Sequence, residues 1–391
     1  MQDHDREPRV HSRRRFVATT AALGLGALAG CTGGNEESTA TTTAADESGG
    51  EEPVGQIGSG RSPFGDRDIT GGVSVAEMPD LSGELTLYSG RGEALVGELI
   101  SFFEDYYDDF DVVPRYNSAA EHVNQIQTEG QNSPADVFFS VNAGSLGALK
   151  DAGRTQDLPS EVLDLVRDEF QDPDGQWTGT SGRARTIPFN TDQFDESEIP
   201  DDIMKFPETE AFRDNIGWAP TYSSFQAFIT AMRVLEGDEA TKEWLQGMQD
   251  LGVTQFNDEF LVSQAVADGE IHAGFANHYY IQRILAGRPN APLSTAFTAG
   301  DAGSIFNVAG ALVLDTADDS ELAANFVRHL LSAEAQDYFA RTTFEYPLVS
   351  GVDPIGELPS IDELSPPEGL DLTQLSDLEG TVRLLREVGV L

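Results

Sequence analysis

The chain of 391 residues is poor in cysteine and in lysine. It contains one cysteine, Cys31, so no disulfide can form within the chain. Lysine occurs only as Lys150, Lys205 and Lys242, whereas Asp and Glu total 67 and the formal net charge is −43. Such a surface is typical of proteins that stay soluble in concentrated salt, where charges are screened over a few ångströms. We interpret the charge as adaptation to a halophilic, archaeal habitat, and it argues against nucleic acid as a partner.

Long apolar runs and enzyme motifs are also missing from the sequence. After residue 31, no segment is apolar enough to be a membrane helix. The chain has no G-x-S-x-G, no H-E-x-x-H and no P-loop, and its six histidines are scattered. It also lacks the ordered acidic loop D-x-[DN]-x-[DN]-G that marks calcium sites. These absences argue against an enzyme and against a calcium-binding role for the acidic surface.

The first 31 residues form a predicted export signal. The basic segment SRRRFV at 12–17 precedes an apolar, small-residue stretch that ends in LAGC at 28–31. This order is typical of a signal peptide, and twin arginines followed by Phe are typical of twin-arginine export. LAGC resembles a lipobox, in which cleavage leaves the cysteine as a lipidated N-terminus. We expect Cys31 to anchor the protein to the outer face of the cytoplasmic membrane; the alternative is a chance cysteine after an ordinary signal peptide.

The next segment, 32–80, is rich in Thr, Gly, Glu and Ser and has few large apolar side chains. Such a composition cannot bury enough apolar surface to fold, so we expect a flexible linker without structure. The residues after position 80 are numerous enough to form two domains with their own cores.

After the linker, short apolar runs alternate with segments of helical periodicity. We predict strands at 84–88, 110–116 and 136–139 and helices at 95–106, 118–129 and 143–151. This order predicts an α/β fold with an open, mostly parallel sheet that carries helices on both faces. Ligands of such sheets bind beyond the carboxyl ends of the strands. The segments 89–92, 117–119 and 140–143 should therefore lie on one rim.

The second half of the chain continues the alternation. An extended segment at 183–190 is a candidate crossover into a second lobe, and a long apolar strand at 304–314 is a candidate return. The predicted helices of this half lie at 225–235, 240–251, 320–331, 333–339 and 378–388.

The stretch AGFANHYY at 273–280 lies between the two candidate crossover strands. A short apolar run ends in Asn277 and His278, and Tyr279 and Tyr280 follow directly. If a helix opens at Ile281, both phenols lie at a strand-to-helix turn, where α/β proteins place ligands. The alternative is that the tyrosines are ordinary core residues that keep a hydrated hydroxyl.

Seven landmarks in order connect residues 84–391 with a known family. They are LYSGR at 87–91, PADVFF at 134–139, SGRAR at 181–185, GWAPT at 217–221, QAV and GE within 264–270, NHYY at 277–280 and EYPL at 345–348. With these landmarks the chain resembles the ferric-ion-binding solute receptors of ABC importers, which are transferrin-like bacterial proteins.

The resemblance implies a two-lobed, type II periplasmic-binding-protein fold of the α/β class. Each lobe would be a mixed, mostly parallel sheet flanked by helices, and crossover strands would form the hinge between the lobes. Residues 81–186 plus 306–358 would form lobe 1, and residues 187–305 plus 359–391 would form lobe 2.

The resemblance also implies the metal ligands. Adjacent tyrosines bind iron in the family, which assigns Tyr279 and Tyr280 this role, and the alignment places Tyr222 where some members have a third tyrosine. Fe³⁺ is a hard cation that anionic oxygen donors suit, and a bound trivalent ion favours the phenolate form. The alternative for Tyr222 is a packing residue on the cleft wall.

The chain departs from the family at two positions. Some members have a histidine after the first strand and a glutamate after the third, whereas this chain has RG at 91–92 and VN at 141–142. A synergistic anion such as carbonate would then complete the coordination, and arginine is the best donor for it. The candidate anion-binding residues are Arg91, Arg183, Arg185, Ser223 and Asn277. Each arginine has an alternative role as an ion-pair partner, and we expect His278 to be a hydrogen-bond partner and not a ligand.

The resemblance thus implies a monomeric, non-enzymatic receptor that captures Fe³⁺ between two lobes and closes by hinge bending. Its partners would be the membrane, through the lipid anchor, and an ABC permease with its ATPase subunits. The alternative hypothesis is a binding protein of the same fold for an iron chelate, another metal or a small anion.

Overall fold

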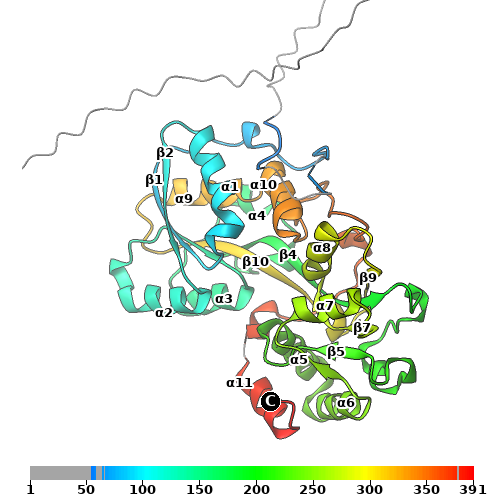
Figure 1. The fold of residues 1–391 in the computed structure, drawn as a ribbon. Helices are drawn as coiled ribbons and strands as arrows, with labels where there is room; N and C mark the ends of the chain where they lie inside the picture. Colours follow the sequence, from blue (N-terminus) through cyan, green and yellow to red (C-terminus); the bar gives the residue numbers. More distant parts are fainter. Residues whose placement is uncertain (1–53, 59–63, 66, 377) are drawn as a thin grey trace, which may run out of the picture. The chain divides into compact units, whose positions relative to one another are not determined.

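The structure is a computed structural model that describes residues 54–58, 64–65, 67–376 and 378–391. The predicted export signal, Cys31 and the first part of the predicted linker lie outside these residues. Within the described ranges, none of the helices has both the length and the apolar character needed to span a bilayer. The described strands form one connected sheet in the order β2-β1-β3-β10-β4-β7-β5-β6, with β8 and β9 also paired to β4 (Figure 1).

The strands are β1 (Gly83–Ser89), β2 (Phe110–Tyr116), β3 (Val137–Ser140), β4 (Thr178–Asn190), β5 (Ile216–Trp218), β6 (Thr254–Gln255), β7 (Ala273–Gly274), β8 (Ala276–Asn277), β9 (Leu293–Ala296) and β10 (Phe306–Val313). The α-helices are α1 (Glu93–Tyr106), α2 (Ala119–Glu129), α3 (Ala143–Asp151), α4 (Ser160–Leu163), α5 (Ser223–Glu236), α6 (Asp238–Asp250), α7 (Glu259–Ala267), α8 (His278–Gly287), α9 (Ser320–His329), α10 (Ala333–Tyr338) and α11 (Glu379–Glu387). A single turn of π-helix, η8 (Phe339–Thr343), follows α10.

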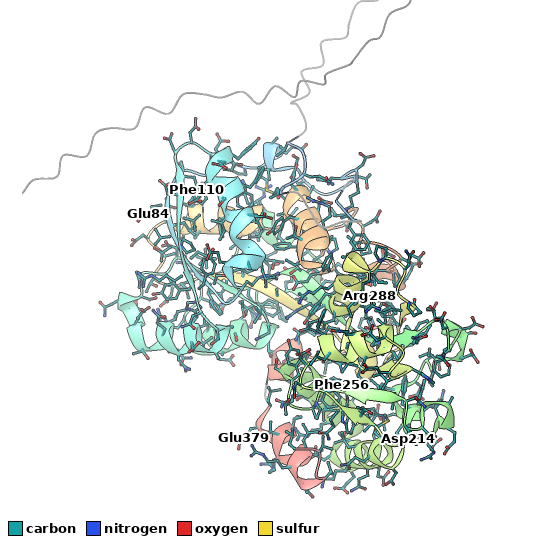
Figure 2. The ribbon with its side chains drawn as sticks, in the orientation of Figure 1. Glu84, Phe110, Asp214, Phe256, Arg288 and Glu379 are labelled. Atoms are coloured by element: carbon teal, nitrogen blue, oxygen red, sulfur yellow. The ribbon has the colours of Figure 1, made fainter. Side chains whose placement is uncertain are left out.

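The first three strands are parallel, and β1 lies between β2 and β3. Figure 2 shows Glu84 and Phe110 beside each other where β1 and β2 begin. Pro114 lies within β2, which is tolerated because β2 is at the edge of the sheet. Ser118 caps α2 and forms a capping box with Glu121, as the predicted start of this helix requires. The sequence pattern thus predicted these strands and helices correctly.

The long strand β4 crosses from one hydrophobic core to another. Its first part is antiparallel to β10, where Ala184 faces Phe306, and its last part pairs with β7, where Phe189 faces Ala273. A Cβ atom at Gly182 would lie 2.1 Å from the Phe306 ring, so only glycine allows the two crossover strands to pack this closely. The strands linked by helices are parallel, and the crossover strands are antiparallel to their neighbours.

Separate cores lie on either side of this crossover. One core gathers side chains of β1, β3, α1 and β10, such as Leu87 and Leu312, together with residues of α9 and α10. Another gathers side chains of β5, α5, α6 and α11, including Trp218, Trp244 and Leu384. A smaller cluster joins α7 to α8. The C-terminal helix α11 therefore packs on the second core although it follows segments of the first in the sequence.

The end of the predicted linker is ordered, which differs from the expectation for residues 32–80. Ile57 and Val75 are buried in the first core, and Arg67 donates to Asp337 from Nε at 2.6 Å. Val75 is also held by a backbone hydrogen bond to Glu334. Single apolar residues in a polar, Gly-rich background have no periodicity, so composition alone concealed these contacts.

Candidate functional site

A cavity of about 1050 Å³ opens where the carboxyl ends of the first three strands meet α5 and α8. Arg91, Ser118 and Asn142, which follow β1, β2 and β3, line one wall. The predicted rim beyond these strands is therefore correct. The cavity is also lined by all three tyrosines that the sequence analysis selects.

The paired tyrosines lie within a helix and not in a turn before it. Helix α8 begins at His278, with Asn277 at the N-cap position, so Tyr279 and Tyr280 belong to its first turn. The expectation that the helix opens at Ile281 was wrong by one turn. The two rings lie against each other with centroids 4.3 Å apart. Both phenols are presented at the amino-terminal end of α8, where the helix dipole favours negative charge.

The third tyrosine reaches the pair from α5. Tyr222 is the N-cap residue of α5, and its hydroxyl forms a short hydrogen bond with the hydroxyl of Tyr280. The hydroxyl of Tyr279 accepts a hydrogen bond from Asn277 Nδ2 at 3.3 Å. The structure therefore brings the three predicted metal ligands to one place, although Tyr222 and Tyr280 are 58 residues apart.

Tyr279 and Tyr280 are neutral in the absence of a cation. Burial raises the pKa of Tyr280, and the neighbouring Tyr279 and Tyr222 raise it further. Burial also raises the pKa of Tyr279, while the positive charge of Arg183 opposes this shift. A bound trivalent ion would reverse the balance, because its charge stabilises phenolates directly. Binding such an ion should therefore release protons.

Four of the five predicted anion-binding residues line the cavity, namely Arg91, Arg183, Ser223 and Asn277. Arg183 is half-buried on β4, and its Nη2 donates a hydrogen bond to the Val141 carbonyl. Its Nε has no hydrogen-bond partner within the part of the chain that the structure describes. This Nε is buried and does not face the cavity, but the residue lines the cavity and its positive charge can attract an anion there.

Arg185 lies behind the site and not in the cavity. Its side chain is 1% exposed, and its guanidinium pairs with Glu259, which is fully buried. The other carboxylate oxygen of Glu259 accepts from the backbone N–H of Asn277 at 3.0 Å. We therefore correct the prediction for Arg185: it fixes the segment that precedes the tyrosines and has no access to a ligand.

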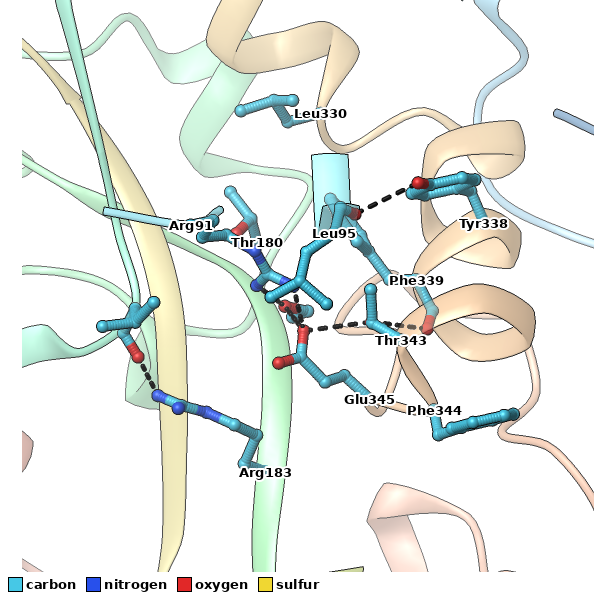
Figure 3. A network of polar contacts seen from close by, with 12 residues as sticks. Arg91, Leu95, Thr180, Arg183, Leu330, Tyr338, Phe339, Thr343, Phe344 and Glu345 are labelled. Carbon is cyan, nitrogen blue, oxygen red and sulfur yellow. Dashed lines mark hydrogen bonds and ion pairs between the residues drawn. The ribbon is translucent and has the colours of Figure 1, made fainter. Parts of the chain in front are cut away.

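Arg91 lines the cavity, but its guanidinium already donates hydrogen bonds to side chains of the protein. Its Nη2 donates to Glu345 at 2.7 Å and its Nη1 donates to Ser181 at 2.9 Å (Figure 3). The guanidinium also lies over the rings of Phe139 and Phe339, 5.3 and 5.2 Å from their centroids. With 1% exposure, Arg91 binds a carboxylate of the protein itself, and this replaces the predicted role toward an anion from solution.

Sequence reasoning missed two residues of the cavity, Arg283 and Glu345. The guanidinium of Arg283 lies 5.5 Å from the ring centroid of Tyr280. Arg283 follows Tyr280 by one helical turn in α8. The i, i+3 spacing could have identified Arg283. Glu345 lies in the EYPL landmark, but no local pattern connects it with Arg91, which is 254 residues away.

His278 connects β4 with the end of η8, and among the described residues it forms no hydrogen bond with a tyrosine hydroxyl. It is fully buried, its Nδ1 accepts from the backbone N–H of Ala184 at 3.1 Å, and its Nε2 donates to the Phe344 carbonyl at 2.8 Å. Burial lowers the pKa of His278 to about 4, so the ring is neutral. The histidine is a hydrogen-bond partner, as expected, but of the backbone.

Conventional metal clusters are absent from the described residues, where no group of three or more His, Cys, Asp and Glu side chains could hold an ion. A metal in this cavity would depend on the phenols. Such a donor set selects hard, highly charged cations and disfavours soft ones.

Comparison with known proteins agrees with this geometry. Residues 132–366 match the family described as bacterial extracellular solute-binding protein. The chain is 30% identical over 323 residues to the major ferric iron-binding protein of Neisseria meningitidis, and the match covers 81% of this chain and 96% of that one.

Solved structures show the same fold. Iron-bound HitA from Pseudomonas aeruginosa aligns with a TM-score of 0.68 at 28% identity, covering 78% of this chain and 99% of its own. Trichodesmium FutA, solved with iron and citrate ligands, aligns with a TM-score of 0.68 at 25% identity and the same coverage. The two-lobed periplasmic-binding-protein fold is therefore confirmed. The chain belongs to the extracellular solute-binding proteins, and it is a binding protein and not an enzyme.

Proposed function

We propose that this protein captures Fe³⁺ in the cavity through Tyr222, Tyr279 and Tyr280 and delivers it to an ABC permease. The observation that carries the proposal is the convergence of three phenol oxygens from α5 and α8 at one point of the cavity. Phenolate oxygens are hard, anionic donors that match a hard trivalent cation. The names of the relatives, which are iron-binding proteins, support the same ligand.

A synergistic anion completes the proposed site. The chain lacks the histidine and glutamate ligands of some relatives, and three phenolates leave coordination positions open on the metal. Arg183, Ser223 and Asn277 line the same cavity and can hold carbonate or a similar anion beside the tyrosines. Arg91 and Arg185 are left out of this role, because each is buried and paired with a glutamate of the chain itself.

The proposed transport cycle uses the hinge. Iron bound to the tyrosines recruits the opposite wall of the cavity, and the crossover strands bend as the lobes close. The closed form then docks on the permease, whose ATPase subunits drive import. Lipidated Cys31 would keep the receptor at the outer face of the cytoplasmic membrane, as a monomer on a flexible tether.

A visible absorption titration tests the proposal. The iron-free protein is titrated with Fe³⁺ in high-salt bicarbonate buffer, because phenolate-to-iron charge transfer gives a broad visible band. We expect a saturable band at one equivalent of iron, with release of protons. Absence of a band at any iron concentration would contradict tyrosine coordination.

An iron chelate is the second candidate ligand. A cavity of about 1050 Å³ has room for more than one ion and a carbonate, and a similar solved structure contains iron and citrate. Replacing bicarbonate with citrate in the same titration distinguishes the two. Tighter binding with one equivalent of citrate than with excess bicarbonate would favour the chelate.

A further inference from the structure

Glu345 is a carboxylate that the protein holds by one oxygen only. Its Oε2 accepts hydrogen bonds from Arg91 Nη2 at 2.7 Å, Ser181 Oγ at 2.6 Å and Thr343 Oγ1 at 3.3 Å. No donor among the described residues forms a hydrogen bond with its other oxygen, Oε1. Figure 3 shows the three contacts converging on one oxygen while the second stays clear of them. The side chain is 10% exposed, and the residue lines the cavity.

The backbone aims this side chain at some conformational cost. The preceding π-helical turn, η8, ends at Phe344, which has left-handed dihedrals (φ 63°, ψ 22°). A bulky residue rarely adopts this conformation, and such strain is found where a structure fixes a functional group. The Phe344 carbonyl accepts the hydrogen bond from His278 Nε2 at 2.8 Å. The histidine that precedes the tyrosine pair thus also fixes the residue that precedes Glu345.

We propose that Oε1 of Glu345 is an additional iron ligand, supplied to the cavity by the segment that follows η8. This inference rests on the proposed function of the tyrosine site. Glu345 would add an anionic oxygen to those of the three phenolates. It would leave a smaller part of the coordination shell to the synergistic anion.

The charges support a carboxylate ligand here. Burial would raise the pKa of the Glu345 carboxyl, but Arg91 and Arg183 lower it below its ordinary value, so the group is ionised at neutral pH. Fe³⁺ with three phenolates carries no net charge, and Glu345 together with Arg91 adds a neutral pair. A ligating carboxylate whose second oxygen is hydrogen-bonded is also the usual arrangement in metal sites.

The test compares Glu345→Gln with the unchanged protein. Iron affinity is measured by competition with a chelator while the visible band is recorded, and the electron paramagnetic resonance spectrum of bound Fe³⁺ reports its ligand symmetry. We expect affinity to fall about 100-fold or more, the phenolate band to persist, and the resonance spectrum to change. Ser181→Ala is the matched control, since it removes one hydrogen bond to Oε2 but keeps Oε1 and its charge. Ser181→Ala should lower iron affinity about 10-fold or less, and the resonance spectrum of bound Fe³⁺ should not change.

Each result has one meaning. Unchanged affinity and an unchanged resonance spectrum in Glu345→Gln would overturn the ligand role of Glu345, while the tyrosine site would stand. No visible band in the unchanged protein would instead refute the proposed function, and the Glu345 proposal with it. If Glu345→Gln does not fold, Glu345→Asp replaces it, because Asp keeps the charge beside Arg91 but withdraws the oxygens by one methylene. Glu345→Asp should then show the same loss of affinity and the same change of spectrum.

Discussion

Two buried arginine–glutamate pairs flank the cavity, and they differ in what their carboxylates leave unused. Behind the tyrosine wall, Glu259 binds Arg185 through one oxygen and the backbone N–H of Asn277 through the other. In the segment that follows η8, one oxygen of Glu345 accepts hydrogen bonds from Arg91, Ser181 and Thr343, and the second has no protein donor among the described residues. Aromatic rings cover both guanidiniums.

The difference separates a structural pair from a functional one. A carboxylate with both oxygens satisfied and no exposure can only hold its surroundings in place, and Glu259 holds the strand end that leads into α8. A carboxylate with one oxygen facing a cavity can still bind a ligand. We therefore expect Glu259 to matter for stability and Glu345 to matter for affinity.

The largest expected effect concerns the Arg185–Glu259 pair, in which both carboxylate oxygens have a protein partner. Glu259→Gln leaves the charge of Arg185 buried and uncompensated, so the free energy of unfolding should fall by about 3–5 kcal/mol. Urea denaturation in high-salt buffer measures it. Glu345→Gln should lose less stability, because the Glu345 side chain keeps 10% exposure at the cavity whereas Glu259 has none, so water can partly solvate the altered site. Equal losses in the two variants would contradict the distinction between the pairs.

The next effect concerns the tyrosine wall. Tyr280→Phe removes the hydroxyl that lies between the other ligands, and we expect iron affinity to fall about 100-fold or more. The visible band should weaken and shift. Tyr106→Phe is the matched control, since Tyr106 is 41% exposed on α1 and does not line the cavity. Equal behaviour of the two variants in the titration would remove the basis for the assignment.

A smaller effect is expected for the anion. Arg183→Gln removes a charged donor of the cavity, and iron affinity in bicarbonate should fall about 10-fold because one charge-assisted contact is lost. The dependence of affinity on bicarbonate concentration should become shallower. A variant that keeps the full bicarbonate dependence would show that the anion binds without Arg183.

The smallest effect is a pH dependence in the first core, away from the cavity. Burial lowers the pKa of His329 to about 4, against an ordinary value near 6.5, so the unfolded chain binds a proton that the folded protein does not. Stability from this group is complete above pH 6.5 and falls by up to about 1.4 kcal/mol per pH unit toward pH 4. In His329→Asn, which keeps the donor to the Asn325 carbonyl, the loss of stability between pH 6.5 and 5.5 should be smaller by about 1 kcal/mol. Identical denaturation profiles would refute the assignment.

Local patterns in the sequence predicted most of the fold. The alternation of apolar runs and amphipathic segments located β1 to β3 and α1 to α3 to within a few residues, because these elements bury one face. The start of α8 was missed, because His278 is a polar residue that the fold buries. Its hydrogen bonds go to the backbone of Ala184 and Phe344, which are distant in the sequence. The ordered end of the linker was missed for a similar reason. Ile57 packs into the first core against residues that are distant from it in the sequence.

The candidate site was only partly predictable. The tyrosines came from a resemblance to a family, and their placement in one cavity agrees with it. The roles of Arg91 and Arg185 could not be assigned, because a lone arginine does not reveal whether a carboxylate will be folded against it. The partners of these arginines lie 254 and 74 residues away, and only the fold brings them together.

The most direct test is a crystal structure of the iron-loaded protein with anomalous scattering at the iron edge. We predict a single iron peak within bonding distance of the hydroxyl oxygens of Tyr222, Tyr279 and Tyr280, with Oε1 of Glu345 on its opposite side. An iron peak elsewhere, or one in the cavity without tyrosine oxygens around it, would contradict the account.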